Sequence, residues 1–379
     1  MNVRDSEVIC GLLKKEGYGL VNEPDKADII LLNTCSVREH AEDKVWSEIG
    51  RIGKLSPLDF VQKTHKIKTG ETPRPTNKIV GLVGCMAQAY KQKVFDRAPN
   101  VNFVVGPSDI DKIPGIINRL STTKIRETEG TIRPEDIYHT GFYEKRNNTY
   151  VVVSEGCSNY CSYCVVPYVR GDLKNRNHKD IIREVEEAVG KGITKITLLG
   201  QNVNAYLSKV ISSQPSVNFI ELLKLVNQIE GIEEFSFITS HPKDTSVELF
   251  RVMASLGKLK KSLHLPIQSG SDRILAMMNR GYTKKFYLEL VTNYRKIVKD
   301  SVLSTDIIVG YPQETDKDFQ ETFDLVKDIE FDAAYIFKYS ARPNTKAAEL
   351  ADDLPRAVKE KRHKIILDLQ KGISKKKRC

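Results

Sequence analysis

Hydrophobic and polar positions alternate in two different ways along this chain of 379 residues. Short, β-branched apolar runs are typical of parallel strands that are buried on both faces. Three such runs come early, at residues 27–35, 78–85 and 100–106. Six more alternate with helical patterns, at residues 149–155, 194–200, 234–239, 261–267, 301–309 and 332–339. The pattern predicts an α/β protein in which an open parallel α/β domain precedes a partial barrel of six βα units.

Helix signals support this alternation. One helical segment presents an apolar face made of Phe219, Leu222, Leu223, Val226 and Ile229, and Asn218 and Glu221 have the spacing of a capping box. An earlier segment repeats the pattern with Ile181, Val185, Ala188 and Val189 and stops at Gly190. Both patterns predict amphipathic helices that pack on the sheet.

Two stretches lack a regular period. Residues 54–77 are rich in Lys and Pro, which indicates an exposed loop or insertion. Residues 121–148 are also irregular. We therefore predict an N-terminal domain at 1–120, a linker at 121–148 and a barrel at 149–372.

Composition narrows the class of protein. Hydrophobic residues make up 40% and charged residues 28%, as in ordinary globular proteins. No apolar run approaches the roughly 18 residues of a membrane span, and the first residues, MNVRDSEV, are polar, so we expect a cytoplasmic protein. The net charge of +10 favours a polyanionic partner such as nucleic acid without requiring one.

Three of the seven cysteines stand close together. Cys157, Cys161 and Cys164 follow the first barrel strand within SEGCSNYCSYC, with the spacing C-x3-C-x2-C. Soft thiolate ligands on one short loop suit an iron–sulfur cluster. Structural zinc is the alternative, but it would need a fourth ligand, and the nearest downstream histidine, His178, is on a different element.

Two further cysteines, Cys35 and Cys85, each follow an early apolar run directly. Ligands of open α/β sheets bind at the carboxyl ends of the strands, so this placement predicts that both thiols face one site. The alternative is that both are buried structural cysteines.

The cysteine stretch, with Tyr163 before its last cysteine, resembles the signature of the radical S-adenosylmethionine enzymes. In that family three cysteines hold a [4Fe–4S] cluster, and S-adenosylmethionine chelates the fourth iron. One electron from the cluster then cleaves this cofactor to a 5′-deoxyadenosyl radical that abstracts hydrogen. The resemblance implies that Cys157, Cys161 and Cys164 are the catalytic ligands and that Tyr163 lies at the cofactor.

The chain is most similar to the methylthiotransferases of this family. The similar segments are ADIILLNTCSVREHAEDKV, GLVGCMAQ, SHP, LHLPIQSGSDRIL, RGYT, STDIIVGYP and ARPNTKAA, and LLGQNVNAY resembles the branch that acts on tRNA. The resemblance implies radical methylthiolation of C2 of N6-dimethylallyladenosine next to the anticodon. S-adenosylmethionine would be both methyl donor and radical source, and Cys35 and Cys85 would be ligands of an auxiliary [4Fe–4S] cluster that carries the sulfur. We expect a monomer whose partners are a tRNA anticodon stem-loop and an electron donor such as a flavodoxin or ferredoxin.

The resemblance also implies the contacts with S-adenosylmethionine. Gly200, Gln201 and Asn202 would hold its amino group. Gln268 and Ser269 would reach its carboxylate or ribose, and Ile308, Val309 and Gly310 would pack on its adenine. Ordinary loop structure at strand ends is the alternative for all of them, and we expect His241 and His264 to be structural.

Two features depart from the family. A family cysteine precedes the segment that begins here at Met1, so we expect the auxiliary site to lack its third ligand. Cys10, on an amphipathic helix, is a poor substitute. The C-terminal TRAM domain is expected to be absent. Lys375, Lys376 and Lys377 form a basic tail that is either a solvated helix face or a phosphate contact, and Cys379 is a chance thiol.

Three alternative functions stay open on the sequence. The first is methylthiotransfer to threonylcarbamoyl-adenosine in tRNA, and the second is methylthiotransfer to a ribosomal protein. The third is a non-catalytic, RNA-binding protein in which the cysteines hold structural zinc.

Overall fold

The computed structural model describes residues 1–36, 39–55, 78–120, 124–144, 147–209 and 216–377. Most of the loop predicted at 54–77 lies outside the described residues, and so does Cys379. The chain divides into two compact units, Asn2–Phe142 and Tyr143–Cys379. None of the helices in the described ranges combines the length and the apolar character that crossing a membrane requires.

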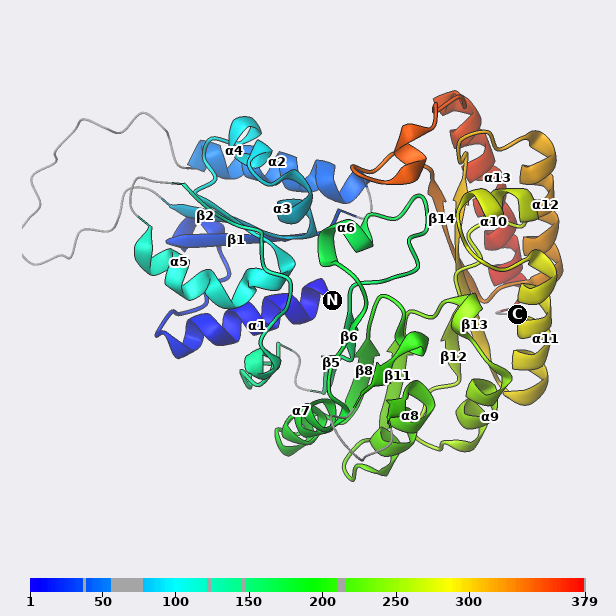
Figure 1. The fold of residues 1–379 in the computed structure, drawn as a ribbon, viewed down its shortest axis with the longest axis horizontal. Coiled ribbons are helices and arrows are strands. Elements are labelled where there is room, and N and C mark those ends of the chain that lie inside the picture. The colour runs from blue at the N-terminus through cyan, green and yellow to red at the C-terminus, as the bar shows by residue number, and fades with distance from the viewer. Residues whose placement is uncertain (37–38, 56–77, 121–123, 145–146, 210–215, 378–379) are drawn as a thin grey trace, which may run out of the picture. The chain divides into compact units, whose positions relative to one another are not determined.

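The first unit contains a parallel sheet with the order β1-β2-β3-β4 (Figure 1). Its strands are β1 (Ile29–Thr34), β2 (Ile79–Gly84), β3 (Phe103–Val105) and β4 (Ile125–Glu127). The three early apolar runs thus form strands, as predicted. Val80, Leu82 and Val104 from the sheet pack with Ile49 and Ile52 in the hydrophobic core of this unit.

Helices connect and cover these strands. They are α1 (Asn2–Lys15), α2 (Glu39–Leu55), α3 (Cys85–Tyr90), α4 (Lys93–Arg97) and α5 (Ile113–Arg119), with short 3-10 turns at Pro24–Lys26, Pro107–Lys112 and Glu135–Tyr138. Strand, helix and strand therefore alternate along the unit, which is the arrangement that parallel pairing requires.

The stretch 121–148 differs from its prediction as an irregular linker. Within it, β4 pairs in parallel with β3 and so belongs to the first sheet. The strand is only three residues long, and Arg126 at its centre is exposed. So short an edge strand has no apolar run and no alternation that sequence periodicity would reveal.

The second unit contains the six predicted barrel strands in sequence order (Figure 1). They are β5 (Asn148–Val152), β8 (Lys195–Leu199), β11 (Glu234–Ile238), β12 (Ser262–His264), β13 (Val302–Val309) and β14 (Ala333–Lys338). All pairs are parallel, in the orders β5-β8-β11 and β12-β13-β14. The Ser240 amide donates to the His264 carbonyl at 3.3 Å and connects the two groups at β11 and β12. The prediction of a partial barrel is confirmed.

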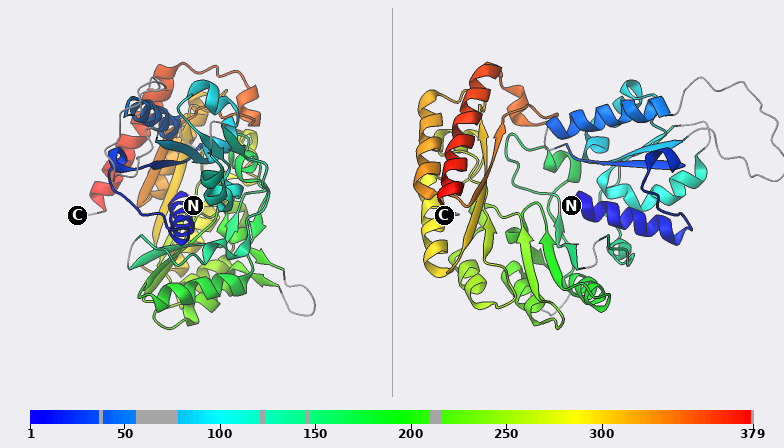
Figure 2. Two further views of the ribbon diagram at one scale, coloured as in Figure 1. Left: turned by 90° about the vertical axis from the view of Figure 1, so that its left-hand side faces the viewer. Right: turned by 180° about the vertical axis from the view of Figure 1, so that it is seen from behind.

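Helices cover the outside of these strands (Figure 2). They are α7 (His178–Gly190), α8 (Phe219–Gln228), α9 (Val247–Ser255), α11 (Lys284–Ile297), α12 (Asp316–Ile329) and α13 (Arg356–Lys376), while the short helices α6 (Val166–Arg170) and α10 (Asp272–Met277) follow strand ends. The predicted capping box of Asn218 and Glu221 is present, and α7 ends at Gly190 as predicted. Two short antiparallel pairs, β6 (Ser154–Glu155) with β7 (Lys174–Asn175) and β9 (Leu207–Ser208) with β10 (Val217–Asn218), complete the unit.

The side chains of β13 alternate between an apolar outer face and a polar inner face of the barrel strands. Leu303, Ile307 and Val309 are buried in the core that also contains residues of α11, α12 and α13. Burial of each such side chain stabilises the fold by roughly 1.5–3 kcal/mol. Ser304 and Asp306 alternate with them and are only partly buried. We call the side of β12, β13 and β14 that carries these polar residues the inner face.

Candidate functional site

The three-cysteine loop follows β5 and β6 and leads into α6. Its entry depends on Gly156, which has a φ of +67°. A Cβ at this position would lie 2.2 Å from the Asp172 carbonyl oxygen, so only glycine fits without a shift of the backbone. The Cys157 amide then donates to the Gly171 carbonyl at 3.1 Å. These contacts set the direction in which the first cysteine leaves the strand.

Segments far away in the sequence hold the middle of the loop. The Ser162 amide donates to the Met278 carbonyl at 3.0 Å, and its hydroxyl donates to the Met277 carbonyl at 2.8 Å. The Ala347 amide donates to the Ser162 carbonyl at 2.8 Å. The Asn279 side chain donates to the Tyr160 carbonyl at 3.0 Å. The loop is therefore anchored at its backbone by the end of α10 and by the turn after β14.

Burial dominates the electrostatics of the thiols. Burial raises the pKa of Cys157, and it raises the pKa of Cys164 to about 12, with a further contribution from the neighbouring Cys161 thiol in both cases. The Cys161 thiol therefore adds to the effect of burial at both of the other loop cysteines. Thiols with raised pKa values bind a metal by exchanging their protons for it, so affinity depends on pH.

Within the described ranges, no group of three or more His, Cys, Asp or Glu side chains is arranged to hold a metal ion. Such an arrangement would be a tight set of ligands around a single ion. A cubane cluster instead distributes its thiolates over different iron atoms.

Arg280 is a buried charged residue in contact with the loop, and only 4% of its surface is exposed. Its Nη1 donates to Cys161 Sγ at 3.3 Å and to Tyr163 Oη at 3.4 Å. Nη2 donates to the Pro266 carbonyl at 2.9 Å, and Nε donates to Tyr282 Oη at 2.9 Å. Burial opposes its charge, but the phenol and thiol groups around it hold the pKa of Arg280 well above its ordinary value. In the sequence, RGYT stood out only as a similar segment, and this role of its arginine was missed.

Buried polar atoms without a partner collect after the first three barrel strands. They are Ser154 Oγ, Asn202 Oδ1, Ser240 Oγ and His241 Nε2, and none has a hydrogen bond within the described part of the chain. A buried polar atom left in this state costs roughly 1–3 kcal/mol, so bound ligands are a common explanation for it. These atoms fit a ligand with ammonium, carboxylate and hydroxyl groups.

Two of the predicted cofactor residues, Gly200 and Asn202, belong to the same strand ends as these unpartnered polar atoms. A Cβ on Gly200 would lie 2.5 Å from Ser154 Oγ, so glycine allows the ends of β5 and β8 to approach closely. The Asn202 side chain donates to Asp244 Oδ2 at 2.6 Å, which orients its unpartnered oxygen. The structure thus brings two of the three predicted residues to this strand end, and Gln201 between them is half-buried.

His241 is neutral in this environment. Burial lowers its pKa to about 2, and the nearby cations Arg280 and Lys243 act in the same direction. Its Nδ1 accepts from the Lys243 amide at 3.2 Å, and its ring meets the ring of Tyr282 edge-on at 5.7 Å. The prediction of a purely structural histidine does not account for its unpartnered Nε2.

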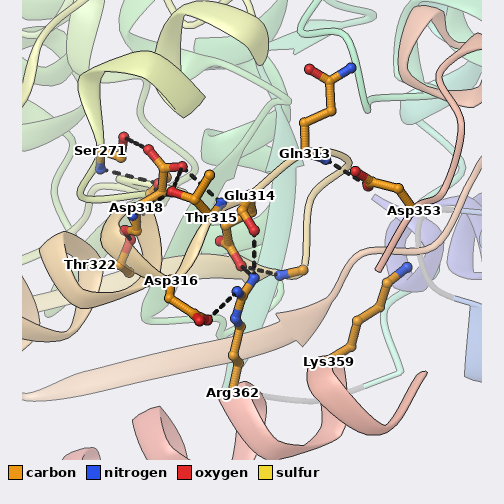
Figure 3. A network of polar contacts seen from close by, with 12 residues as sticks. Ser271, Gln313, Glu314, Thr315, Asp316, Asp318, Thr322, Asp353, Lys359 and Arg362 are labelled. Atoms are coloured by element: carbon orange, nitrogen blue, oxygen red, sulfur yellow. Dashed lines mark hydrogen bonds and ion pairs between the residues drawn. The ribbon is translucent and has the colours of Figure 1, made fainter. Parts of the chain in front are cut away.

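A polar network connects the segments after β12 and β13 with α12 and α13 (Figure 3). The Ser269 hydroxyl contacts Thr322 Oγ1 at 3.3 Å. The Gly310 amide donates to Glu314 Oε2 at 2.8 Å, and the same carboxylate pairs with Arg362 at 2.7 Å. These contacts are scaffold contacts, as the loop-structure alternative expects, and a cofactor role for Ser269 and Gly310 stays a prediction.

Other predicted residues approach one another from distant positions. Tyr163 and Ile308 pack in the same small hydrophobic cluster with Met278 and Tyr311. Gln268 is buried and extends the ladder of β13, because its amide donates to the Asp306 carbonyl at 2.9 Å and its carbonyl accepts from the Ile308 amide at 2.9 Å. The structure therefore places Tyr163, Gln268 and Ile308 around one end of β13.

Cys35 and Cys85 occupy equivalent positions in the first unit. Thr34 pairs with Gly84 in the parallel register of β1 and β2, and each cysteine is the next residue. Gly84 has a φ of +95°, and a Cβ there would lie 2.6 Å from the Thr34 carbonyl oxygen. Cys85 is buried and Cys35 is half-buried. The register brings both cysteines to the same edge of the sheet, and a shared site for their thiols stays a prediction.

Cys10 lies further along α1 than the residues of this helix that bond to the end of β1. The first turns of α1 contact the end of β1, because Asn33 Nδ2 donates to the Asn2 carbonyl at 2.8 Å and to Ser6 Oγ at 3.0 Å. Cys10 lies about 12 Å further along the helix axis than Asn2. It lines a cavity of about 390 Å³ with Ile9 and Leu13.

The inner face carries a second polar group. His264 Nδ1 contacts Ser304 Oγ at 2.9 Å, and its Nε2 contacts Asp306 Oδ2 at 3.3 Å. The ring of Tyr335 lies 6.1 Å from that of His264, and 53% of Tyr335 is exposed. His264 is thus hydrogen-bonded as expected, but it also helps to form a surface with an exposed aromatic ring.

The basic tail is partly neutralised. Lys376 pairs with Glu330 at 3.1 Å, and Lys377 pairs with Asp332 at 2.9 Å. These pairs favour the prediction of a solvated helix face for at least part of the tail.

Comparison with known proteins supports two regions of homology. The model of the Radical SAM superfamily matches residues 151–326, and the model of the Uncharacterized protein family UPF0004 matches residues 1–106. Among solved structures, the radical S-adenosylmethionine methyltransferase TsrM from Kitasatospora setae aligns with a TM-score of 0.61 over 91% of this chain and 72% of that chain. The sequence identity of 13% limits this likeness to the fold.

Curated relatives match over the whole chain. Proteins named tRNA-2-methylthio-N(6)-dimethylallyladenosine synthase are 40% identical in Clostridium botulinum and 41% identical in Caldicellulosiruptor saccharolyticus. Both alignments cover 100% of this chain, with 80% and 77% of the relatives. The protein of that name from Moorella thermoacetica is 38% identical over 99% of this chain and 81% of its own.

Proposed function

Because the chain belongs to the family of the tRNA-2-methylthio-N(6)-dimethylallyladenosine synthases, we propose that it methylthiolates C2 of N6-dimethylallyladenosine next to the anticodon of tRNA. We propose that the reaction takes place in the cytoplasm. The observation that carries the proposal is the loop of Cys157, Cys161 and Cys164, anchored from both sides and in contact with one buried cation.

The three loop cysteines would hold a [4Fe–4S] cluster, which when bound with S-adenosylmethionine supplies the electron for cleavage of that cofactor. The anchored backbone around Ser162 would keep the ligands in place during electron transfer. Burial of Cys161 and partial burial of Cys157 and Cys164 would limit the access of water to the reaction. A low-potential donor such as a flavodoxin or ferredoxin would deliver the electron to the protein, which we propose acts as a monomer.

S-adenosylmethionine would bind at the ends of β5, β8 and β11. The unpartnered oxygens of Ser154, Asn202 and Ser240 would accept hydrogen bonds from its ammonium or hydroxyl groups. Gly200 would keep the space between β5 and β8 small, and Gln201 beside it would contribute its side-chain amide. Tyr163 and Ile308 would offer apolar surface to its adenine. Gln268, Ser269 and Gly310 would shape the remaining wall.

Cys35 and Cys85 would hold the auxiliary cluster that carries the sulfur. This part of the proposal is supported by the register of β1 and β2, which sets both cysteines at one sheet edge. Two thiolates supply only part of the ligand set of a cubane. Iron content is therefore the direct measure of this site.

The substrate base would lie against the inner face. Modification of a base in tRNA requires that it be unstacked from the anticodon loop. The exposed ring of Tyr335 offers a surface on which the base can stack, and His264 and Asp306 offer hydrogen bonds beside it. The positive charge of the chain suits an RNA partner.

The test uses an anaerobically reconstituted chain with S-adenosylmethionine, sulfide, a reductant and an anticodon stem-loop that carries N6-dimethylallyladenosine. Mass spectrometry of the digested nucleosides should show one methylthio group in place of hydrogen, and Cys157→Ala should abolish this product. Product from a threonylcarbamoyl-adenosine stem-loop or a ribosomal protein alone would contradict the proposed substrate. Stoichiometric zinc without iron would contradict the enzyme itself.

The stacking surface has its own test. Loss of base stacking costs roughly 1–3 kcal/mol, so Tyr335→Ala should weaken binding of the modified stem-loop by about 5- to 150-fold. Tyr335→Phe keeps the ring and should bind like the parent chain. Equal affinity of the Ala variant, measured by fluorescence anisotropy, would remove Tyr335 from the substrate site.

A further inference from the structure

We propose that Arg280 raises the reduction potential of the cluster held by Cys157, Cys161 and Cys164, acting through its hydrogen bond to the Cys161 sulfur. The inference rests on the proposed function, because it needs a cluster on these cysteines. It assigns Arg280 as a positioning residue for this cluster.

The geometry around Arg280 leaves its guanidinium one orientation. Nε donates to Tyr282, Nη2 to the Pro266 carbonyl and Nη1 to the Cys161 sulfur. Tyr282 is itself fixed, because its hydroxyl donates to the Ile267 carbonyl at 2.9 Å. A planar fork with several donors can make these contacts together, whereas a lysine ammonium cannot. The contact with sulfur is thus held by the loop after β12.

The charge of Arg280 has no carboxylate partner in the part of the chain that the structure describes. Other arginines of the same unit do, since Arg362 pairs with Glu314 at 2.7 Å and Arg273 pairs with Asp318. A buried cation without a counter-charge costs several kcal/mol. A cluster on three thiolates is anionic, so it would supply the missing negative charge next to Cys161.

The effect on the cluster follows from electrostatics. Reduction adds one negative charge to the cluster, and a nearby cation stabilises the reduced form more than the oxidised form. Hydrogen bonds to ligand sulfurs act in the same direction, and both are established influences on cluster potentials. Removal of Arg280 should therefore make the cluster harder to reduce.

The experiment is a potentiometric titration of the reconstituted full chain, followed by the electron paramagnetic resonance signal of the reduced cluster. A Cys35→Ala, Cys85→Ala background restricts the signal to the loop cluster. Arg280→Gln should lower the reduction equilibrium constant about tenfold or more, which is about 59 mV for one electron. Arg280→Lys, which keeps the charge but not the fork, should show a smaller fall.

Arg295→Gln is the matched control. Arg295 also donates from its guanidinium to backbone carbonyls, to Ile329 at 2.6 Å and to Glu330 at 3.1 Å, and these lie at the end of α12. Its loss should leave the potential unchanged.

An unchanged potential in Arg280→Gln with full cluster content would overturn the inference. If Arg280→Gln assembles no cluster, the potentials of Arg280→Lys and Tyr282→Phe provide the test, because both variants weaken the contact with Cys161. Unchanged potentials in both variants would overturn the inference equally. A parent chain that assembles no [4Fe–4S] cluster contradicts the proposed function instead, so the two failures are distinguishable.

Discussion

The two cysteine regions begin in the same way and are held in different ways. In each, a glycine with positive φ precedes a cysteine, Gly84 before Cys85 and Gly156 before Cys157. In each, a Cβ on that glycine would collide with a backbone carbonyl oxygen. Both segments thus leave a strand by a turn that only glycine allows.

The support of the two regions differs. Cys35 and Cys85 are placed by the register of two neighbouring strands, with Thr34 Oγ1 donating to the Val83 carbonyl at 2.7 Å between them. The three-cysteine loop depends on contacts with the end of α10 and with the turn after β14. Sheet pairing alone can place two ligands, whereas a loop with three ligands needs support from several elements.

The largest expected effect is that of Cys161→Ala. Loss of one loop ligand should remove the loop cluster and lower cleavage of S-adenosylmethionine by at least about a thousandfold, because the ligands act as a unit. Chromatographic detection of 5′-deoxyadenosine measures it. Cys10→Ala serves as the thiol control and should keep cleavage. Full cleavage in Cys161→Ala would mean that the two regions do not differ in role as proposed.

Cys85→Ala should separate the two roles. We expect the methylthiolated product to disappear while cleavage of S-adenosylmethionine stays close to that of the parent chain, because the three loop cysteines proposed for cleavage are in the other unit. Mass spectrometry of nucleosides and chromatography of 5′-deoxyadenosine on the same samples provide both readouts. Parallel loss of both would contradict independent roles for the two regions.

Alanine substitutions at the two turn glycines compare the stability of the two turns directly. Gly156→Ala and Gly84→Ala should each lower the free energy of unfolding of their own unit by roughly 1–3 kcal/mol. The effect should be larger at Gly156, where the Cβ would lie 2.2 Å from a carbonyl oxygen, than at Gly84, where that distance is 2.6 Å. Peptide-resolved hydrogen exchange reports each unit separately.

Helical glycines with open space around them are the controls. An added Cβ on Gly190 in α7 or on Gly115 in α5 would meet no neighbouring heavy atom within 4 Å, so alanine should be neutral or stabilise by up to about 1 kcal/mol. Equal effects at turn and helix positions would show that the turns are not restricted to glycine.

The smallest expected effects concern single hydrogen bonds. Ser162→Ala and Thr34→Val should each cost roughly 0.5–1.5 kcal/mol in urea denaturation. We expect only Ser162→Ala to reduce iron content as well, because its hydroxyl connects the ligand loop to Met277 and Tyr311. Iron loss in Thr34→Val but not in Ser162→Ala would contradict the proposed difference between the two cysteine regions.

The sequence by itself determined the alternation of strands and helices, the two sets of cysteines, the capping box of α8 and the end of α7. These features depend on neighbours within a few residues, and their periods and turn residues are visible along the chain. Strand β4 was missed because three residues are too few to show a period.

Only the tertiary structure decided which residues complete the site. Arg280 contacts Cys161 across 119 positions of sequence, and the unpartnered atoms of Ser154, Asn202 and Ser240 come from three different strand ends. Their burial and their contacts arise from the packing of the barrel, and no local pattern records either. Scaffold roles for Ser269 and Gly310 were likewise visible only once α12 and α13 packed beside them.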